Sequence, residues 1–126
     1  MKIPDDLMYS KDHEWVRLVG LVARVGITDY AQDALGDVVF VQLPNTGQSV
    51  EAGSSCSEVE STKSVSDIYV PVSGKIIAVN QALSESPGLI NSDPYGDGWI
   101  MEIEVTDTAS VAGLMDASSY KQLVEG

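Results

Sequence analysis

"EVESTKSVSDIYVPVSG", residues 58–74, places a single lysine, Lys63, between two runs of β-branched, hydroxyl-bearing and acidic residues. Runs of this kind favour strands, and the small polar residues of 61–64 between them favour a tight turn. We therefore predict a β-hairpin with Lys63 at its tip, the most exposed place on a compact β domain. The residues alone leave two interpretations open. Lys63 is either an ordinary solvated turn lysine or the mount for a covalent tether, a long flexible side chain on a rigid hairpin.

The strand after the turn should bury one of its two faces, because its apolar residues alternate with polar ones. Asp67 and Tyr69 then point the opposite way. Pro71 cannot donate to a ladder, so this strand should be an edge strand or carry a bulge there. The residues expected to face the core are Ile68, Val70 and Val72.

Alternation of period two also dominates the rest of the chain. Residues 14–28 read as a hairpin that turns at Gly20, with one face of its second strand formed by Leu21, Ala23, Val25 and Ile27. Further strands are expected in 36–44, in a brief piece between Gly47 and Gly53, in 74–80 and in 98–105. Many short strands with turn signals at close spacing favour a barrel or sandwich over an α/β sheet.

Helical signals are few. Thr28 is a plausible N-cap for a helix over 29–35, and Gly36 follows its end. Residues 110–125 should form two short helices, the second beginning near Asp116 or Ser118. The predicted fold class is mainly β with a few short helices, including C-terminal ones, in a single domain spanning 1–126.

Composition limits the possible partners. Seven basic and nineteen acidic residues give a formal net charge of −12. A surface of this charge repels phosphate backbones and anionic lipids, so we expect no nucleic-acid partner and no membrane association. A single cysteine, Cys56, excludes an internal disulfide. The sequence start shows neither a signal peptide nor a transit segment, which indicates a cytoplasmic protein.

The sequence offers few candidate catalytic groups. His13 beside Glu14 is a possible acid–base pair, and Cys56 is a possible nucleophile. One histidine and one cysteine provide neither metal-ligand spacing nor the parts of a triad. The glycine-rich PYGDGW, residues 94–99, lacks the cation and the strand–loop–helix context of a phosphate loop. We therefore expect a binding or carrier protein with no metal site, and not an enzyme.

Several fragments, taken together and in order, resemble the H proteins of the glycine cleavage system. They cover nearly the whole chain: HEW (13–15), GITDYAQDALGDVVFVQLP (26–44), EVESTKSVSD (58–67), PVSGKI (71–76), VN (79–80) and LINSDPYGDGW (89–99). The resemblance implies a lipoyl-domain-like barrel-sandwich hybrid with short added helices, which agrees with the strand pattern.

By the same resemblance, Lys63 is the lysine that carries lipoate in amide linkage. From its Cα to the distal sulfur, about a dozen bonds give an arm of about 14 Å. The implied role is that of a shuttle. It takes the aminomethyl group from glycine decarboxylase to aminomethyltransferase and then passes electrons to dihydrolipoamide dehydrogenase. A lipoyl-attaching enzyme is the fourth implied partner, and a shuttle that visits several enzymes is best served as a monomer.

The resemblance also assigns roles to neighbouring residues. Glu14 and Asp67 correspond to the acidic lining of the cleft that shelters the loaded arm. Segment 60–62, which comprises Glu60, Ser61 and Thr62, corresponds to the part recognised during lipoylation. Three features depart from the family pattern: Ala34 replaces a histidine found in some relatives, Cys56 replaces a bulkier apolar residue, and the Val19-Gly20-Leu21 turn is apolar where relatives are usually polar.

Three alternatives share parts of this pattern. A biotinyl domain also presents a lysine on a hairpin, but Thr62 and Ser64 stand where methionines usually flank that lysine. A lipoyl relay protein, which donates lipoate to other dehydrogenase complexes, would carry the same hairpin. An adaptor whose lysine is never modified is the third alternative.

Overall fold

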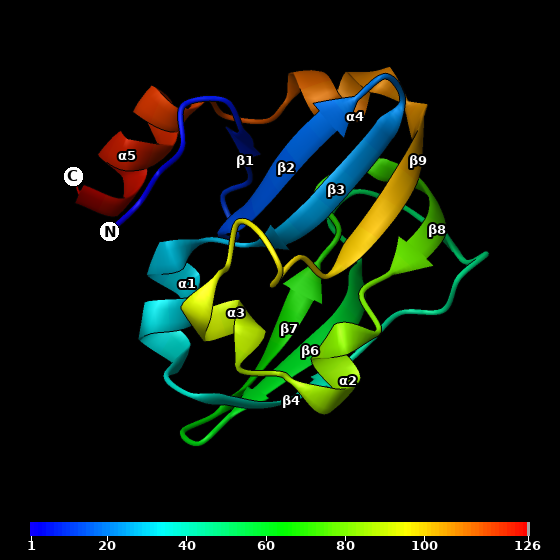
Figure 1. Ribbon diagram of the computed structural model, residues 1–126. Coiled ribbons are helices and arrows are strands. Elements are labelled where there is room, and N and C mark those ends of the chain that lie inside the picture. Colours follow the sequence, from blue (N-terminus) through cyan, green and yellow to red (C-terminus); the bar gives the residue numbers. More distant parts are fainter. Residues whose placement is uncertain (126) are drawn as a thin grey trace.

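The computed structural model describes residues 1–125, which form two β-sheets with short helices at their margins (Figure 1). One sheet has six strands in the order β1-β2-β3-β9-β8-β5, and the other has three in the order β4-β6-β7. All the strand pairs are antiparallel, and none of the helices within 1–125 is long and apolar enough to cross a membrane. The strands are β1 (Met8–Tyr9), β2 (Glu14–Val19), β3 (Val22–Ile27), β4 (Val38–Gln42), β5 (Ser49–Val50), β6 (Ser55–Ser61), β7 (Val65–Tyr69), β8 (Ser73–Val79) and β9 (Met101–Asp107). The helices are α1 (Asp29–Leu35), α2 (Ala82–Glu85), α3 (Leu89–Ser92), α4 (Thr108–Ala112) and α5 (Ala117–Glu125).

The main core lies between the two sheets and is aliphatic. Alternate residues of both sheets point into it, because successive side chains of a strand face opposite ways. The larger sheet contributes residues such as Val25, Ile76 and Ile103, and the smaller sheet contributes Val41, Val59 and Ile68, all buried. The smaller sheet therefore keeps one face on the core and presents the other to solvent.

A second, smaller core anchors the two ends of the chain. Trp15, on the opposite side of β2 from Val16, belongs to it, and its Nε1 donates to the carbonyl of Pro94 at 2.8 Å. The rings of Tyr9 and Tyr120 stack at 4.6 Å. The N-terminal segment and α5 consequently lie side by side at one end of the molecule (Figure 1).

The hairpin predicted around Lys63 is confirmed. Strands β6 and β7 pair across it, and the loop projects below α1 in Figure 1. β7 is an edge strand, as predicted, but it ends at Tyr69, so Pro71 lies in the link to β8 and makes no bulge. The expected inward position of Leu21 is wrong. The turn between β2 and β3 includes Leu21 together with Gly20, and the Leu21 side chain is 57% exposed.

The capping signals of α1 act as the sequence indicated. Thr28 Oγ1 accepts the amide of Ala31 at 3.2 Å, and Gly36 follows the helix with a φ of 85°. At the C-terminus, α5 begins one residue after Asp116, whose carboxylate accepts the amide of Ser119 at 2.8 Å. The short helices α2 and α3 were not predicted. The mainly β class with short helices, including C-terminal ones, is confirmed.

Candidate functional site

The turn that carries Lys63 is built by Ser61. The Ser61 amide donates to the carbonyl of Ser64 at 2.8 Å, and its hydroxyl accepts the amides of Lys63 and Ser64, both at 3.1 Å. Ser61 is itself buried. Because one hydroxyl organises the two amides of the loop, the backbone beneath Lys63 is held in a single shape.

A second set of hydrogen bonds ties this turn to the rest of the fold. The amide of Thr62 donates to the carbonyl of Asp37 at 3.0 Å. On either side of Asp37, Asn91 of α3 bridges two backbone groups: its Oδ1 accepts the amide of Val38 at 2.9 Å, and its Nδ2 donates to the carbonyl of Gly36 at 2.9 Å. The hairpin tip is thus held through segment 36–38 by a side chain distant in sequence.

Lys63 itself is exposed and lies over Gly36. A Cβ atom on Gly36 would stand 3.1 Å from Cε of Lys63, and only glycine adopts the backbone conformation there easily. In the described part of the chain Lys63 makes no ion pair; the pair found there joins Arg24 and Glu102 at 3.0 Å. The lysine amine is therefore accessible to a modifying enzyme.

A groove of about 200 Å³ runs between α1 and β7. Leu35 lines the α1 side of the groove and directly precedes Gly36, over which the Lys63 side chain lies. The groove therefore begins beside the lysine. Asp67 lines its β7 side, and Ala34 lines the α1 side. The remaining lining residues are Asp12, His13, Ile27, Tyr30, Ala31, Ser66 and Ile68.

His13 closes the far end of this groove and is held in place from behind. Its Nδ1 lies 2.8 Å from the hydroxyl of Tyr120, which in turn lies 2.7 Å from Thr28 Oγ1. The ring packs against Tyr30 at 4.7 Å, and its backbone has a φ of 70°. Burial lowers the pKa of His13, so the ring is neutral at pH 7. The sequence placed Glu14 beside it as a possible acid–base pair, but the hydrogen bond of His13 goes to Tyr120.

Glu14 is buried, with 1% of its surface exposed, and lies on a different hollow from Asp67. Ser10 Oγ lies 2.6 Å from its Oε1, and the backbone of Tyr69 gives a further hydrogen bond. Burial nevertheless raises the pKa of Glu14 to about 8, so the carboxyl is largely protonated at neutral pH. Its hollow, of about 370 Å³, also reaches Leu114 and Met115.

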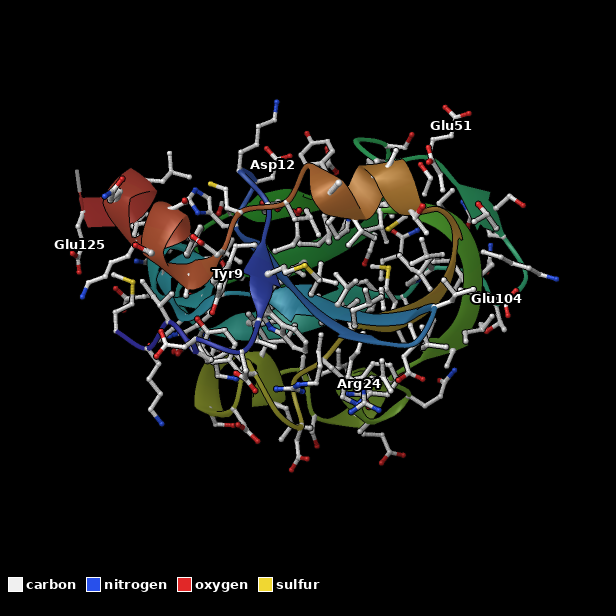
Figure 2. The ribbon with its side chains drawn as sticks, turned by 90° about the horizontal axis from the view of Figure 1, so that it is seen from above. Tyr9, Asp12, Arg24, Glu51, Glu104 and Glu125 are labelled. Carbon is white, nitrogen blue, oxygen red and sulfur yellow. The ribbon has the colours of Figure 1, made fainter. Side chains whose placement is uncertain are left out.

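Asp12 borders both hollows and projects from the edge of the molecule in Figure 2. Sequence reasoning did not single it out, and nothing in the local sequence distinguishes it from the other acidic residues. It is the carboxylate that links the groove of Asp67 to the hollow of Glu14. The two acids named from the resemblance therefore do not share one cavity, although Asp12 connects their surroundings.

Within residues 1–125, Cys56 contacts no base that could activate it as a nucleophile. Its Sγ lies 3.7 Å from Met101 Sδ and 3.8 Å from the carbonyl of Ile68, and the partly buried side chain packs against the main core. Burial raises the pKa of the thiol to about 12, which keeps it protonated. Cys56 is a small apolar packing residue here.

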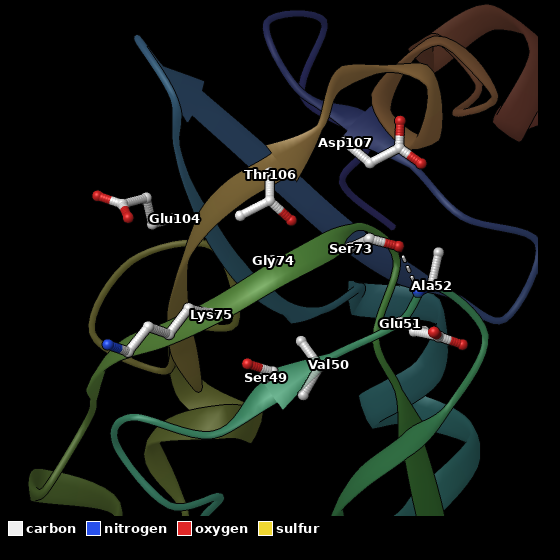
Figure 3. A pocket seen from close by; sticks show the side chains of 10 residues that line it. All are labelled: Ser49, Val50, Glu51, Ala52, Ser73, Gly74, Lys75, Glu104, Thr106 and Asp107. Atoms are coloured by element: carbon white, nitrogen blue, oxygen red, sulfur yellow. Dashed lines mark hydrogen bonds between the residues drawn. The ribbon is translucent and has the colours of Figure 1, made fainter.

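A more voluminous hollow, of about 610 Å³, lies over β5, β8 and β9, well away from the lysine hairpin. Figure 3 shows its ionisable side chains spread apart, with Lys75 and Glu104 on one side and Glu51 and Asp107 on the other. The one hydrogen bond drawn there joins Ser73 Oγ to the amide of Ala52 at 2.9 Å and serves the backbone. Because no group of side chains converges in this hollow, the candidate site is the Lys63 hairpin with its groove.

Comparison with known proteins identifies the family of this chain. The family model described as glycine cleavage H-protein matches residues 7–126. The chain belongs to this family. It is 56% identical over 124 residues to the glycine cleavage system H protein of Cronobacter sakazakii, covering 98% of this chain and 96% of that one. It is 58% identical over 120 residues to the H protein of Micrococcus luteus, covering 94% of each chain.

The crystal structure of a glycine cleavage system H protein from Mycobacterium marinum superposes with a TM-score of 0.91 at 46% identity, covering 98% of this chain and all of that one. The fold class implied by the resemblance, a lipoyl-domain-like barrel-sandwich hybrid, is confirmed by this match.

Proposed function

We propose that this chain is a lipoyl carrier of the glycine cleavage system. Lipoate joined to Lys63 Nζ by an amide would take the aminomethyl group from glycine decarboxylase to aminomethyltransferase and then electrons to dihydrolipoamide dehydrogenase. The observation that carries the proposal is the exposed Lys63 on a hairpin tip whose backbone is held by Ser61 from within and by Asp37 from outside. Family membership over residues 7–126 supports it.

The residues around Lys63 suit a tethered lipoyl group. When bound, lipoate supplies a disulfide that accepts and releases the transferred group and electrons. The chain supplies a rigid base and an unpaired amine, since Lys63 makes no ion pair within 1–125 that would have to be broken. Small polar neighbours, Thr62 and Ser64, leave the amine open on both sides.

The groove between α1 and β7 fits the tethered arm in length. The seven residues of α1 span about 9 Å, because each rises about 1.5 Å. The arm of about 14 Å starts at the Lys63 Cα, and about 6 Å of it is the lysine stem that lies over Gly36. The remaining length of about 8 Å is comparable with that of α1, so the distal sulfur can reach the part of the groove near Asp12 and His13. Asp67 and Asp12 there supply carboxylates for a cationic end group, and we propose that Glu14, in the adjoining hollow, adds a third acid by losing its proton.

Segment 60–62 is proposed to guide lipoylation in two ways. Glu60 and Thr62 are exposed and can touch the attaching enzyme directly. Ser61 is buried and shapes the turn, so its contribution would pass through the backbone of Lys63. The chain would act as a single cytoplasmic, monomeric carrier domain without catalytic residues of its own.

The test is exchange of labelled bicarbonate with the glycine carboxyl in the presence of glycine decarboxylase. Lys63→Arg should fold like the wild type and support no exchange, because a guanidinium does not form the lipoyl amide. Lys75→Arg, at an exposed lysine on β8, is the matched control and should retain exchange. A folded Lys63→Arg protein that still supports exchange would refute the proposal.

A further inference from the structure

The outer face of the small sheet carries an apolar pair beside the lysine hairpin. Register places Phe40 of β4 opposite Glu60 of β6, and Glu60 opposite Val65 of β7, so the three side chains form one row across the sheet. Phe40 is 55% exposed and Val65 is 58% exposed. Phe40 is the single phenylalanine of the sequence, and the fold leaves it in solvent instead of in the core.

A bulge in β4 enlarges this apolar area. The register between β4 and β6 shifts between Val38 and Phe40, which leaves Val39 between them exposed as well. Bulges re-aim side chains at the edge of a sheet, and β4 is an edge strand. β4 thus presents two consecutive apolar side chains, Val39 and Phe40, to solvent.

The same face is acidic. The next row across the sheet joins Gln42, Glu58 and Asp67, all exposed, and Glu60 stands between Phe40 and Val65. None of the three strands contains a lysine or arginine, and Lys63 lies in the loop. The complementary partner surface therefore places a basic group opposite Glu60, between two apolar contacts, and further basic groups opposite Glu58 and Asp67.

We infer that this face, with Phe40 and Val65 as its apolar contacts, docks the enzyme that attaches lipoate to Lys63. The inference rests on the proposed lipoylation of Lys63. The attaching enzyme must reach Nζ itself, which lies about 6 Å from the lysine Cα. A standard interface buries about 800 Å² per partner, a disc of about 16 Å radius. Strand spacings place Val65 about 7 Å and Phe40 about 12 Å from Lys63, inside such a disc.

Glycine decarboxylase, aminomethyltransferase and dihydrolipoamide dehydrogenase do not need to reach Nζ. They act on sulfur atoms up to about 14 Å from the lysine Cα, so they can work without covering this sheet. Glu60, named from the resemblance as a lipoylation residue, stands at the centre of the apolar row, which makes the new contacts continuous with that segment. The position of this face therefore favours the attaching enzyme as its binding partner.

The test measures lipoylation of the full unmodified chain by a purified lipoate–protein ligase with lipoate and ATP, followed by intact mass over time. Phe40→Ala should lower kcat/KM for the protein roughly tenfold through a higher KM, with kcat nearly unchanged. Val65→Thr, which keeps the β-branched shape, should lower it in the same direction. Leu21→Ala is the matched control, because Leu21 is equally exposed but lies on the β2–β3 turn.

Each variant is then lipoylated to completion with excess ligase, reduced to the dithiol with a phosphine that is afterwards removed, and reoxidised by dihydrolipoamide dehydrogenase with NAD⁺ as the electron acceptor. Unchanged reoxidation of the Phe40 and Val65 variants, with Leu21→Ala lipoylated at the wild-type rate, is the supporting result. The inference is overturned if Phe40→Ala is lipoylated with wild-type kcat/KM, if Leu21→Ala loses as much, or if reoxidation slows equally. Wild-type protein that gains no mass would instead refute the proposed function and, with it, this inference.

Discussion

Replacement of Glu14 by glutamine should change how stability depends on pH. Burial raises the pKa of Glu14 from 4.5 to about 8. Between these values the folded protein holds a proton that the unfolded chain has released, so unfolding releases a proton and stability falls as pH rises. One pH unit in this window corresponds to about 1.4 kcal/mol. Glutamine has the same shape but no acidic proton, so the stability of Glu14→Gln should not fall with pH in this way.

The effect is therefore measured as the difference in unfolding free energy between the wild type and Glu14→Gln. From pH 5 to pH 8 the unfolding free energy of the wild type should fall relative to that of Glu14→Gln by about 1.4 kcal/mol per unit, or a few kcal/mol in all. Below pH 4.5 the difference should be constant, since Glu14 is then protonated in both states. Above pH 8 it should again be constant, and the variant should be the more stable protein.

Denaturant unfolding at fixed ionic strength, followed by tryptophan fluorescence at several pH values, measures this difference. Glu104→Gln removes an equal charge from an exposed position on β9 and is the control. A flat difference for Glu14→Gln would show that Glu14 is ionised in the folded protein. The hollow beside Asp12 would then hold a carboxylate already, and its proposed ionisation on receiving a cation would be wrong.

Three further changes test the support of the hairpin. Ser61→Ala removes the acceptor of two loop amides and should cost about 1–2 kcal/mol in denaturant unfolding while slowing lipoylation, and unaltered stability would contradict its role in the turn. Asn91→Ala should cost about 2–3 kcal/mol and also slow lipoylation because it frees segment 36–38, and Asn91→Asp, which keeps the acceptor for Val38, should cost less. Gly36→Ala should cost about 1–3 kcal/mol by backbone strain and should displace the Lys63 stem, which a chemical-shift change at the lysine methylenes would report; a variant as stable as the wild type would contradict the strain.

The lysine hairpin could be predicted from sequence because its signals are local. Period-two alternation, the small polar residues of 61–64 and the proline that stops β7 all lie within one stretch. The capping of α1 is equally local, with Thr28 before the helix and Gly36 after it. Leu21 was misplaced because the alternation of apolar residues continues into the turn and does not show where the second strand begins. The pairing of Val19 with Val22 leaves Leu21 in the turn.

The groove and the anchor of the hairpin could not be predicted, since they depend on contacts between distant segments. Asn91 meets Gly36 and Val38 across more than fifty residues. Asp12 and His13 reach the groove through a loop in which His13 adopts a positive φ, a conformation that stays uncommon for histidine although histidine is enriched in it. Helices α2 and α3 have four residues each, and the residue just before each helix makes no side-chain cap, so they leave no capping-box signal in the sequence.

The central claim, that Lys63 carries the lipoyl group, is tested most directly by intact mass with peptide mapping of the protein purified from its native cell. The account predicts one lipoyl increment per chain, located on the peptide that contains Lys63 and missing from Lys63→Arg produced in the same cell. An unmodified wild-type protein, or a lipoyl increment on another lysine such as Lys75, would contradict it.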